Sequence, residues 1–110
     1  MSSELAKRKC AACDGDTPPL KGEALHALKG QLSGGWRILK EKCLERQFQF
    51  PDFRSALEFT NRVGGLAEEQ GHHPDIFLTY GEVRIQIWTH KVNGLTESDF
   101  ILAAKIDELG

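Results

Sequence analysis

The chain has 110 residues, of which 40% are hydrophobic and 27% are charged, and its formal net charge at pH 7 is −2. These values predict one compact domain with a modest core, and a domain of this size often gains stability from self-association. A weakly acidic chain without a basic stripe gives no electrostatic footprint for nucleic acid. No apolar run approaches the roughly 20 residues that cross a bilayer, and the N-terminus lacks the apolar region of a signal peptide. We therefore expect neither nucleic acid nor membrane as a direct partner.

Residues 1–19 are predicted to form a flexible N-terminal arm, and residues 20–110 the folded domain. The arm contains Cys10 and Cys13 in CxxC spacing, which is half of a zinc knuckle, while Cys43 stands alone. The two arm thiols are either incidental or part of a metal or redox site. An odd number of cysteines fits a reducing compartment better than a disulfide framework, so we expect a cytoplasmic protein.

The next predicted elements are a short helix and a β-hairpin. Leucine and alanine recur at every fourth residue over 21–32, which favours a helix. His26 lies on this helix, and we expect it to be exposed. Apolar alternation predicts strands over 36–41 and 44–50, with Trp36 either in the core or in a pocket wall.

A long helix is predicted between Asp52 and Gly71. Asp52 follows a proline and is a good N-cap, and Gly71 is well placed as the C-cap. The helix places Glu68 in its last turn and presents His72 and His73 just beyond its end. One apolar stripe at spacings of three and four is expected to face the core: Phe53, Ala56, Leu57, Thr60, Val63, Gly64 and Ala67.

A second hairpin is predicted over 75–80 and 83–89, with a two-residue type II′ turn at 81–82. The expected register gathers the apolar side chains on one face, because successive residues of a strand point to opposite faces. It also places His73 and His90 together on the other face, at the open end of the hairpin. The facing apolar pairs in this register are Ile76 with Ile87, Leu78 with Ile85, and Tyr80 with Val83.

Thr96 and Asp99 have capping-box spacing and open a final helix, which gives Asp99 a structural explanation. The element order is helix, two strands, helix, two strands, helix. Segregated hairpins and helices predict an α+β fold, with a four-stranded antiparallel sheet and helices packed on one face. The other face, with Trp88 and His90, is then open to a substrate or a partner.

Three of the four histidines, His72, His73 and His90, are thus expected near one another. Imidazole, with a pKa of roughly 6.5, can donate or accept a proton near neutrality. Repulsion between neighbouring cations favours one neutral ring as a base and one protonated ring as an acid, which suits removal of one proton and delivery of another to a leaving group. Two alternatives stay open: a zinc site of three histidines and water, and turn histidines bonded to the backbone.

The pattern around these histidines extends along the chain. It comprises Gly35-Trp36, Phe48-Gln49-Phe50, Glu68 with three residues before His72-His73-Pro74, Tyr80, Thr89-His90, and Gly94-Leu95-Thr96-Glu97 leading to Asp99. Over residues 35–109, this pattern resembles the pterin-4a-carbinolamine dehydratase family.

The resemblance implies dehydration of 4a-hydroxytetrahydropterin to quinonoid dihydropterin, the step that recycles tetrahydrobiopterin after aromatic amino-acid hydroxylation. His72 and His90 are implied as the acid/base pair, with His73 binding and sharing the work. Glu68 and Asp99 are implied to orient the imidazoles. The implied substrate-binding residues are Gly71, His72, His73, Pro74, Trp88, Thr89, His90 and Lys91.

The resemblance also implies that no metal or other cofactor is needed, because the substrate's own nitrogen drives expulsion of the hydroxyl group. The implied partners are the pterin substrate and an aromatic amino-acid hydroxylase in the same pathway, and the implied assembly is a homodimer or homotetramer. Animal members of the family double as a dimerisation cofactor of a transcription factor. A non-catalytic protein-interaction module is therefore the alternative function.

Overall fold

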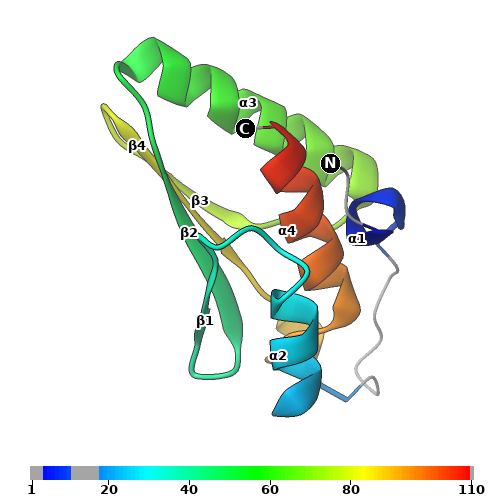
Figure 1. Ribbon diagram of the computed structural model, residues 1–110. Coiled ribbons are helices and arrows are strands. Elements are labelled where there is room, and N and C mark those ends of the chain that lie inside the picture. The colour runs from blue at the N-terminus through cyan, green and yellow to red at the C-terminus, as the bar shows by residue number, and fades with distance from the viewer. Residues whose placement is uncertain (1–3, 11–17, 110) are drawn as a thin grey trace.

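The computed structural model describes residues 4–10 and 18–109, and within them the chain forms an α+β fold. The elements are α1 (Glu4–Lys7), α2 (Glu23–Lys29), β1 (Arg37–Leu39), β2 (Cys43–Gln49), α3 (Phe53–Gln70), β3 (Asp75–Leu78), β4 (Glu82–Ile87), the 3-10 helix η1 (His90–Val92) and α4 (Glu97–Leu109). The strands form one antiparallel sheet in the order β1-β2-β4-β3, and the helices lie on one side of it (Figure 1). The predicted fold class is confirmed. Within the described residues, no helix has the length and apolar character that crossing a membrane requires.

The core lies between the sheet and α4, most of whose residues are buried. Every second side chain of β2 and β4 faces it: Leu44, Phe48, Val83, Ile85 and Ile87 are buried. Trp36 is 1% exposed and its indole N–H donates to Asp107 at 2.8 Å, so it belongs to the core. Asp107 also pairs with Arg46 at 2.5 Å, which ties the last turns of α4 to β2.

Both predicted caps of α3 are present. The Asp52 carboxylate accepts a hydrogen bond from the Ser55 backbone N–H at 2.8 Å, and this bond holds the pKa of Asp52 below its usual value. Gly71 ends the helix in the left-handed conformation, at φ 67°. A left-handed residue is the usual end of a helix, and glycine adopts it without steric cost.

The apolar stripe predicted for α3 is wrong in part. Phe59 lies outside that stripe but is buried, with its ring centroid 4.6 Å from Phe48 and 5.2 Å from Phe50. Phe53 and Leu57 are instead 44% and 39% exposed. An aromatic ring buries far more apolar area than an alanine or threonine, so packing of the three rings sets the rotation of the helix.

The second hairpin has a different register from the predicted one. Ile76 faces Ile85 and Leu78 faces Val83, two positions earlier in β4 than expected. The Thr79 N–H donates to the Glu82 carbonyl at 2.9 Å, so the turn is centred one residue before the predicted type II′ turn. Because the shift is even, the predicted apolar face of the strands is preserved. The predicted pairing of Tyr80 with Val83 is wrong, because Tyr80 lies in the turn and is 70% exposed.

Gly81, in the turn of the second hairpin, is needed for a close approach to Phe50, which directly follows β2. The Phe50 N–H donates to the Gly81 carbonyl at 2.8 Å. A Cβ atom at position 81 would lie only 3.1 Å from the Phe50 carbonyl oxygen. This glycine lies in the turn, as predicted, and it also admits Phe50, directly after β2, beside the hairpin tip.

The described part of the predicted flexible arm, residues 4–10, is packed on α4. Leu5 is fully buried, and the Lys105 ammonium group donates to the Ala6 carbonyl at 2.7 Å. The Cys10 backbone N–H donates to the Gln70 side chain at 3.1 Å. A domain this small gains a large share of its core from one more buried leucine, so the prediction is wrong for this segment. The CxxC prediction includes Cys13, which lies outside the described residues.

A polar network covers part of the sheet face that turns away from the helices. Glu45 is only 5% exposed, accepts a hydrogen bond from the Gln86 side chain at 2.7 Å, and pairs with Arg37. The Gln86 hydrogen bond, followed by the Arg37 interaction, holds the pKa of Glu45 below its ordinary value, against the opposing effect of burial.

Replacing Glu45 should make the free energy of unfolding less sensitive to a fall in pH. A carboxylate whose pKa is depressed in the folded state stabilises the fold above its unfolded-state pKa, and this stabilisation is lost as pH falls through the folded-state pKa. We expect Glu45→Gln to lower the free energy of unfolding by about 1 kcal/mol at neutral pH. In urea titrations between about pH 6 and about pH 3, the difference from the wild type should shrink toward zero. A difference independent of pH would contradict this assignment.

Two glycines of the same chain should respond in opposite directions to alanine. A Cβ atom at Gly65, inside α3, would meet no atom within 4 Å, and alanine there should stabilise the protein by roughly 0.5–1 kcal/mol. Gly71 also has open space but holds φ 67°, and alanine there should cost about 1 kcal/mol. Urea unfolding of Gly65→Ala and Gly71→Ala measures both changes. Equal changes in stability would argue against a conformational origin.

Candidate active site

The end of α3 delivers His72 to the start of α4. After the left-handed Gly71, the His72 backbone N–H donates to the Ala67 carbonyl at 3.3 Å, which turns the chain back toward α4. The His72 Nε2 atom then lies 2.6 Å from Asp99 Oδ1, with 14% of the His72 side chain exposed. A histidine and an aspartate 27 residues apart thus form a mostly buried pair.

Asp99 has the capping role that the sequence predicted and a further role. Its Oδ2 atom accepts from the Thr96 backbone N–H at 2.8 Å, as a capping box requires. The Thr96 hydroxyl is instead 3.0 Å from the Thr89 hydroxyl, which itself donates to Asp99 Oδ2 at 2.8 Å. The Asp99 side chain is fully buried and bonded on both oxygens. The spacing of Thr96 and Asp99 indicated the cap but not the bond to His72.

His73 forms a second pair with a carboxylate, and this pair is exposed. The imidazole Nε2 atom bonds to Glu68, which lies in the last turn of α3. The two side chains are 60% and 78% exposed. This pair therefore lies at the surface, in a solvent-screened setting that differs from that of the His72 pair.

His90 begins η1, directly after the end of β4, and lies against Trp88. The two ring centroids are 4.1 Å apart. The Trp88 indole N–H is 3.5 Å from Asp75 Oδ2, which links this group to the start of β3. The predicted pairing of His73 with His90 is wrong, because the observed register ends before both residues. His90 is connected to His72 by another route, through the neighbouring Thr89 and Asp99.

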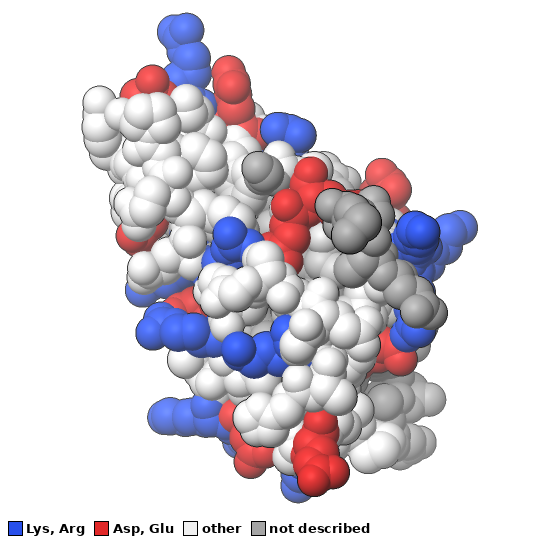
Figure 2. Space-filling view, viewed as in Figure 1, with Lys and Arg blue, Asp and Glu red and all other residues white. Residues whose placement is uncertain are grey.

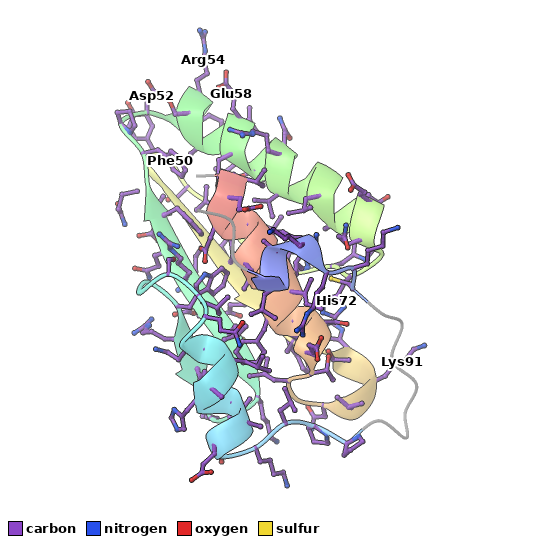
Figure 3. All side chains as sticks on the ribbon, turned by 45° about the vertical axis from the view of Figure 1, so that its right-hand side comes forward. Phe50, Asp52, Arg54, Glu58, His72 and Lys91 are labelled. Atoms are coloured by element: carbon purple, nitrogen blue, oxygen red, sulfur yellow. The ribbon has the colours of Figure 1, made fainter. Side chains whose placement is uncertain are left out.

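The remaining predicted substrate-binding residues differ in exposure. Gly71 and Lys91 are exposed, Pro74 is half-buried, and Thr89 is buried. Lys91 extends from η1 toward solvent (Figure 3). Acidic and basic side chains are interspersed on the face of the molecule shown in Figure 2. His26 is exposed on α2, as expected from the sequence.

Within the described ranges, no group of three or more histidine, cysteine, aspartate or glutamate residues has an arrangement that could hold a metal ion. Cys43, on β2, is not suited to nucleophilic catalysis. Burial, followed by the charge of Glu45, raises the pKa of its thiol to about 11. The thiolate is the nucleophile, so this cysteine is weakly reactive at neutral pH.

Comparison with known proteins identifies the family. The family model described as pterin 4 alpha carbinolamine dehydratase matches residues 18–109. The chain belongs to this family. A provisionally named pterin-4-alpha-carbinolamine dehydratase of Rubrobacter xylanophilus is 56% identical over 107 residues, which are 97% of this chain and 99% of the relative. A relative with the same provisional name from Alkaliphilus metalliredigens is 45% identical over 106 residues, 96% of each chain.

Solved structures agree with this membership in the dehydratase family. A transcriptional coactivator/pterin dehydratase from Brucella melitensis superposes with a TM-score of 0.77 at 30% identity, covering 83% of this chain and 97% of the other. A pterin dehydratase-like protein identified as a RuBisCO assembly factor in the alpha-carboxysome superposes with a TM-score of 0.60 at 26% identity, covering 70% and 90%.

The two histidine–carboxylate pairs should differ sharply in their effect on stability. Asp99→Ala leaves three donors without their acceptor in a buried site, and we expect a loss of about 2–4 kcal/mol in the free energy of unfolding. Glu68→Ala removes an exposed partner, and we expect a change below about 0.5 kcal/mol. Urea unfolding monitored by tryptophan fluorescence compares the two. A loss for Glu68→Ala that matches the Asp99→Ala loss would refute the distinction.

Proposed function

We propose that this member of a hydro-lyase family converts 4a-hydroxytetrahydropterin to quinonoid dihydropterin by histidine acid/base catalysis. Family membership and the names of the relatives support the pterin dehydratase activity. The observation that carries the mechanism is the buried His72–Asp99 pair, whose aspartate also binds the residue that precedes His90.

The reaction needs two proton transfers and no external electrons. The N5 lone pair forms the C4a=N5 bond as the C4a–O bond breaks. One imidazolium delivers a proton to the departing hydroxyl, which leaves as water, and a neutral imidazole accepts the N5 proton. Positioned histidines typically contribute about 10²–10⁴-fold to such a reaction.

Within this proposal, His72 and His90 are the acid/base pair. The His72 Nε2 atom is engaged by Asp99, so Nδ1 is the nitrogen that exchanges a proton with the substrate. His73, oriented by Glu68, binds the pterin and shares the proton transfers. Trp88 offers an aromatic surface for the bicyclic ring, and its contact with His90 keeps both groups at one site. Gly71, Pro74 and Lys91 form the rim.

The same proposal includes a place in tetrahydrobiopterin recycling, in the cytoplasm and next to an aromatic amino-acid hydroxylase. A homodimer or homotetramer fits the exposed apolar side chains of Phe53 and Leu57, which lie one helical turn apart on α3.

A protein-interaction module is the second candidate, and the exposed apolar residues of α3 also favour it. One structural neighbour is named a transcriptional coactivator as well as a dehydratase, and the other is named an assembly factor. The two functions differ in one respect that can be measured directly: only an enzyme accelerates dehydration over the spontaneous rate.

Removing either member of the acid/base pair should abolish most activity in a folded protein. We expect His72→Ala and His90→Ala each to lower kcat/KM for 4a-hydroxytetrahydropterin by about 10²–10⁴-fold. His26→Ala, on the exposed surface of α2, is the matched control and should keep wild-type activity. The assay couples the purified protein to a phenylalanine hydroxylase, and circular dichroism checks the fold.

Near-wild-type turnover in both variants would remove the acid/base mechanism. A wild type that does not exceed the spontaneous rate would favour the interaction module. Elemental analysis of protein purified without chelator addresses the zinc alternative, because a stoichiometric zinc content would support it.

A further inference from the structure

Thr89 is predicted from the sequence to contact the substrate, but its hydroxyl group is already used inside the protein. The residue is 5% exposed, and its hydroxyl lies 2.8 Å from Asp99 Oδ2. A carboxylate only accepts hydrogen bonds, and a hydroxyl has a single proton, so this proton is given to Asp99. Thr89 therefore has little exposed surface and no free hydroxyl proton with which to contact a pterin.

The hydrogen bonds around Asp99 form an ordered chain. Since the Thr89 proton goes to Asp99, the proton between the Thr89 and Thr96 hydroxyls, 3.0 Å apart, comes from Thr96. The Thr96 backbone N–H donates a second hydrogen bond to Asp99 Oδ2, and the His72 Nε2 atom lies 2.6 Å from Asp99 Oδ1. Each bond in such a buried chain polarises the next, so these donors fix the position of the Asp99 carboxylate as an acceptor.

The carboxylate oxygen Oδ1, acting as acceptor, determines the tautomer of His72. The Nε2 atom must carry a proton to bond with Asp99, so a neutral His72 has its lone pair on Nδ1. The Thr89 hydroxyl keeps the carboxylate from rotating about its side chain. It thereby holds the His72 ring with Nε2 on Asp99, so that Nδ1 is the nitrogen outside this bond.

The backbone of Thr89 anchors the loop that carries His90. Its N–H donates to the Gly94 carbonyl at 2.8 Å, and the two residues form an isolated antiparallel bridge. The loop closed by this bridge begins with His90. One residue therefore fixes His72 through its side chain and His90 through its backbone.

We infer that Thr89 is a positioning residue for the acid/base pair, which acts through Asp99 on the tautomer and orientation of His72 and does not bind the substrate. This inference rests on the proposed function, and it adds a role that can be measured without turnover.

The test compares Thr89→Val, which keeps the shape and removes the hydroxyl, with Thr89→Ser, which keeps the hydroxyl. We expect Thr89→Val to lower kcat by about 10- to 100-fold, because a hydrogen bond to a charged group is lost, while KM changes by less than about threefold. Thr89→Ser should recover kcat to within about threefold of the wild type. Thr60→Val is the control, because the Thr60 hydroxyl bonds within its own helix, to the Ala56 carbonyl at 2.9 Å, and it should change neither parameter.

Nitrogen-15 NMR of histidine-labelled protein, with His72 assigned from His72→Gln, reports the tautomer directly. The wild type and Thr89→Ser should hold neutral His72 with its proton on Nε2, and Thr89→Val should populate both tautomers. Should Thr89→Val not fold, Thr96→Val takes its place, since its backbone N–H still bonds to Asp99. A smaller fall in kcat is then expected, with KM unchanged.

A Thr89→Val protein with raised KM and unchanged kcat would overturn the inference in favour of a substrate contact. Unchanged kcat together with an unchanged tautomer would overturn it as well. A wild type without dehydratase activity would remove the proposed function alone, because the tautomer of His72 still decides the role of Thr89.

Discussion

A buried negative charge organises the end of the molecule where the histidines gather. Asp99 is fully buried, and removing a carboxylate from water costs several kcal/mol unless protein donors replace the lost water. The donors come from the start of α4, the end of β4 and the end of α3: Thr96, Thr89 and His72. Satisfying this one group therefore draws three segments together. The catalytic candidates assemble as a consequence of burying Asp99, since His72 is itself a donor and His90 follows another donor in the chain.

Features set by neighbouring residues were predictable from the sequence. The caps of α3 depend on Asp52 and Gly71 and on backbone groups within one turn of each, and both are as expected. The capping bond between Thr96 and Asp99 has the same local origin. Alternation along the strands predicted the core face of the second hairpin correctly, even though the register was wrong, because a shift of two residues does not change the face.

Features set by distant contacts were not predictable in this way. Gly81 lies in the turn, as the sequence predicted, but the close approach of Phe50, which follows β2, has no signature in the sequence around Gly81. On α2 the sequence favoured a stripe through Ala24, but Leu25 is the buried residue, because tertiary packing selects the larger side chain. Leu5 was assigned to a flexible arm, and only the position of α4 makes it part of the core. The link from Thr89 to Asp99 likewise has no signature in the spacing of the two residues.

The two adjacent histidines form the same kind of pair with a carboxylate, but the two pairs differ in burial. His72 and His73 each bond to a carboxylate through Nε2, so composition alone would treat them as equivalent. The partner of His72 is fully buried and bonded on both oxygens, which limits the ring to one orientation. The partner of His73 is 78% exposed, where water competes for the carboxylate and Glu68 holds the ring less firmly. Proton transfer depends on a fixed donor or acceptor, whereas binding tolerates adjustment. Under the proposed function, this difference in burial favours His72 for the chemical step, while His73 holds the substrate and shares the proton transfers.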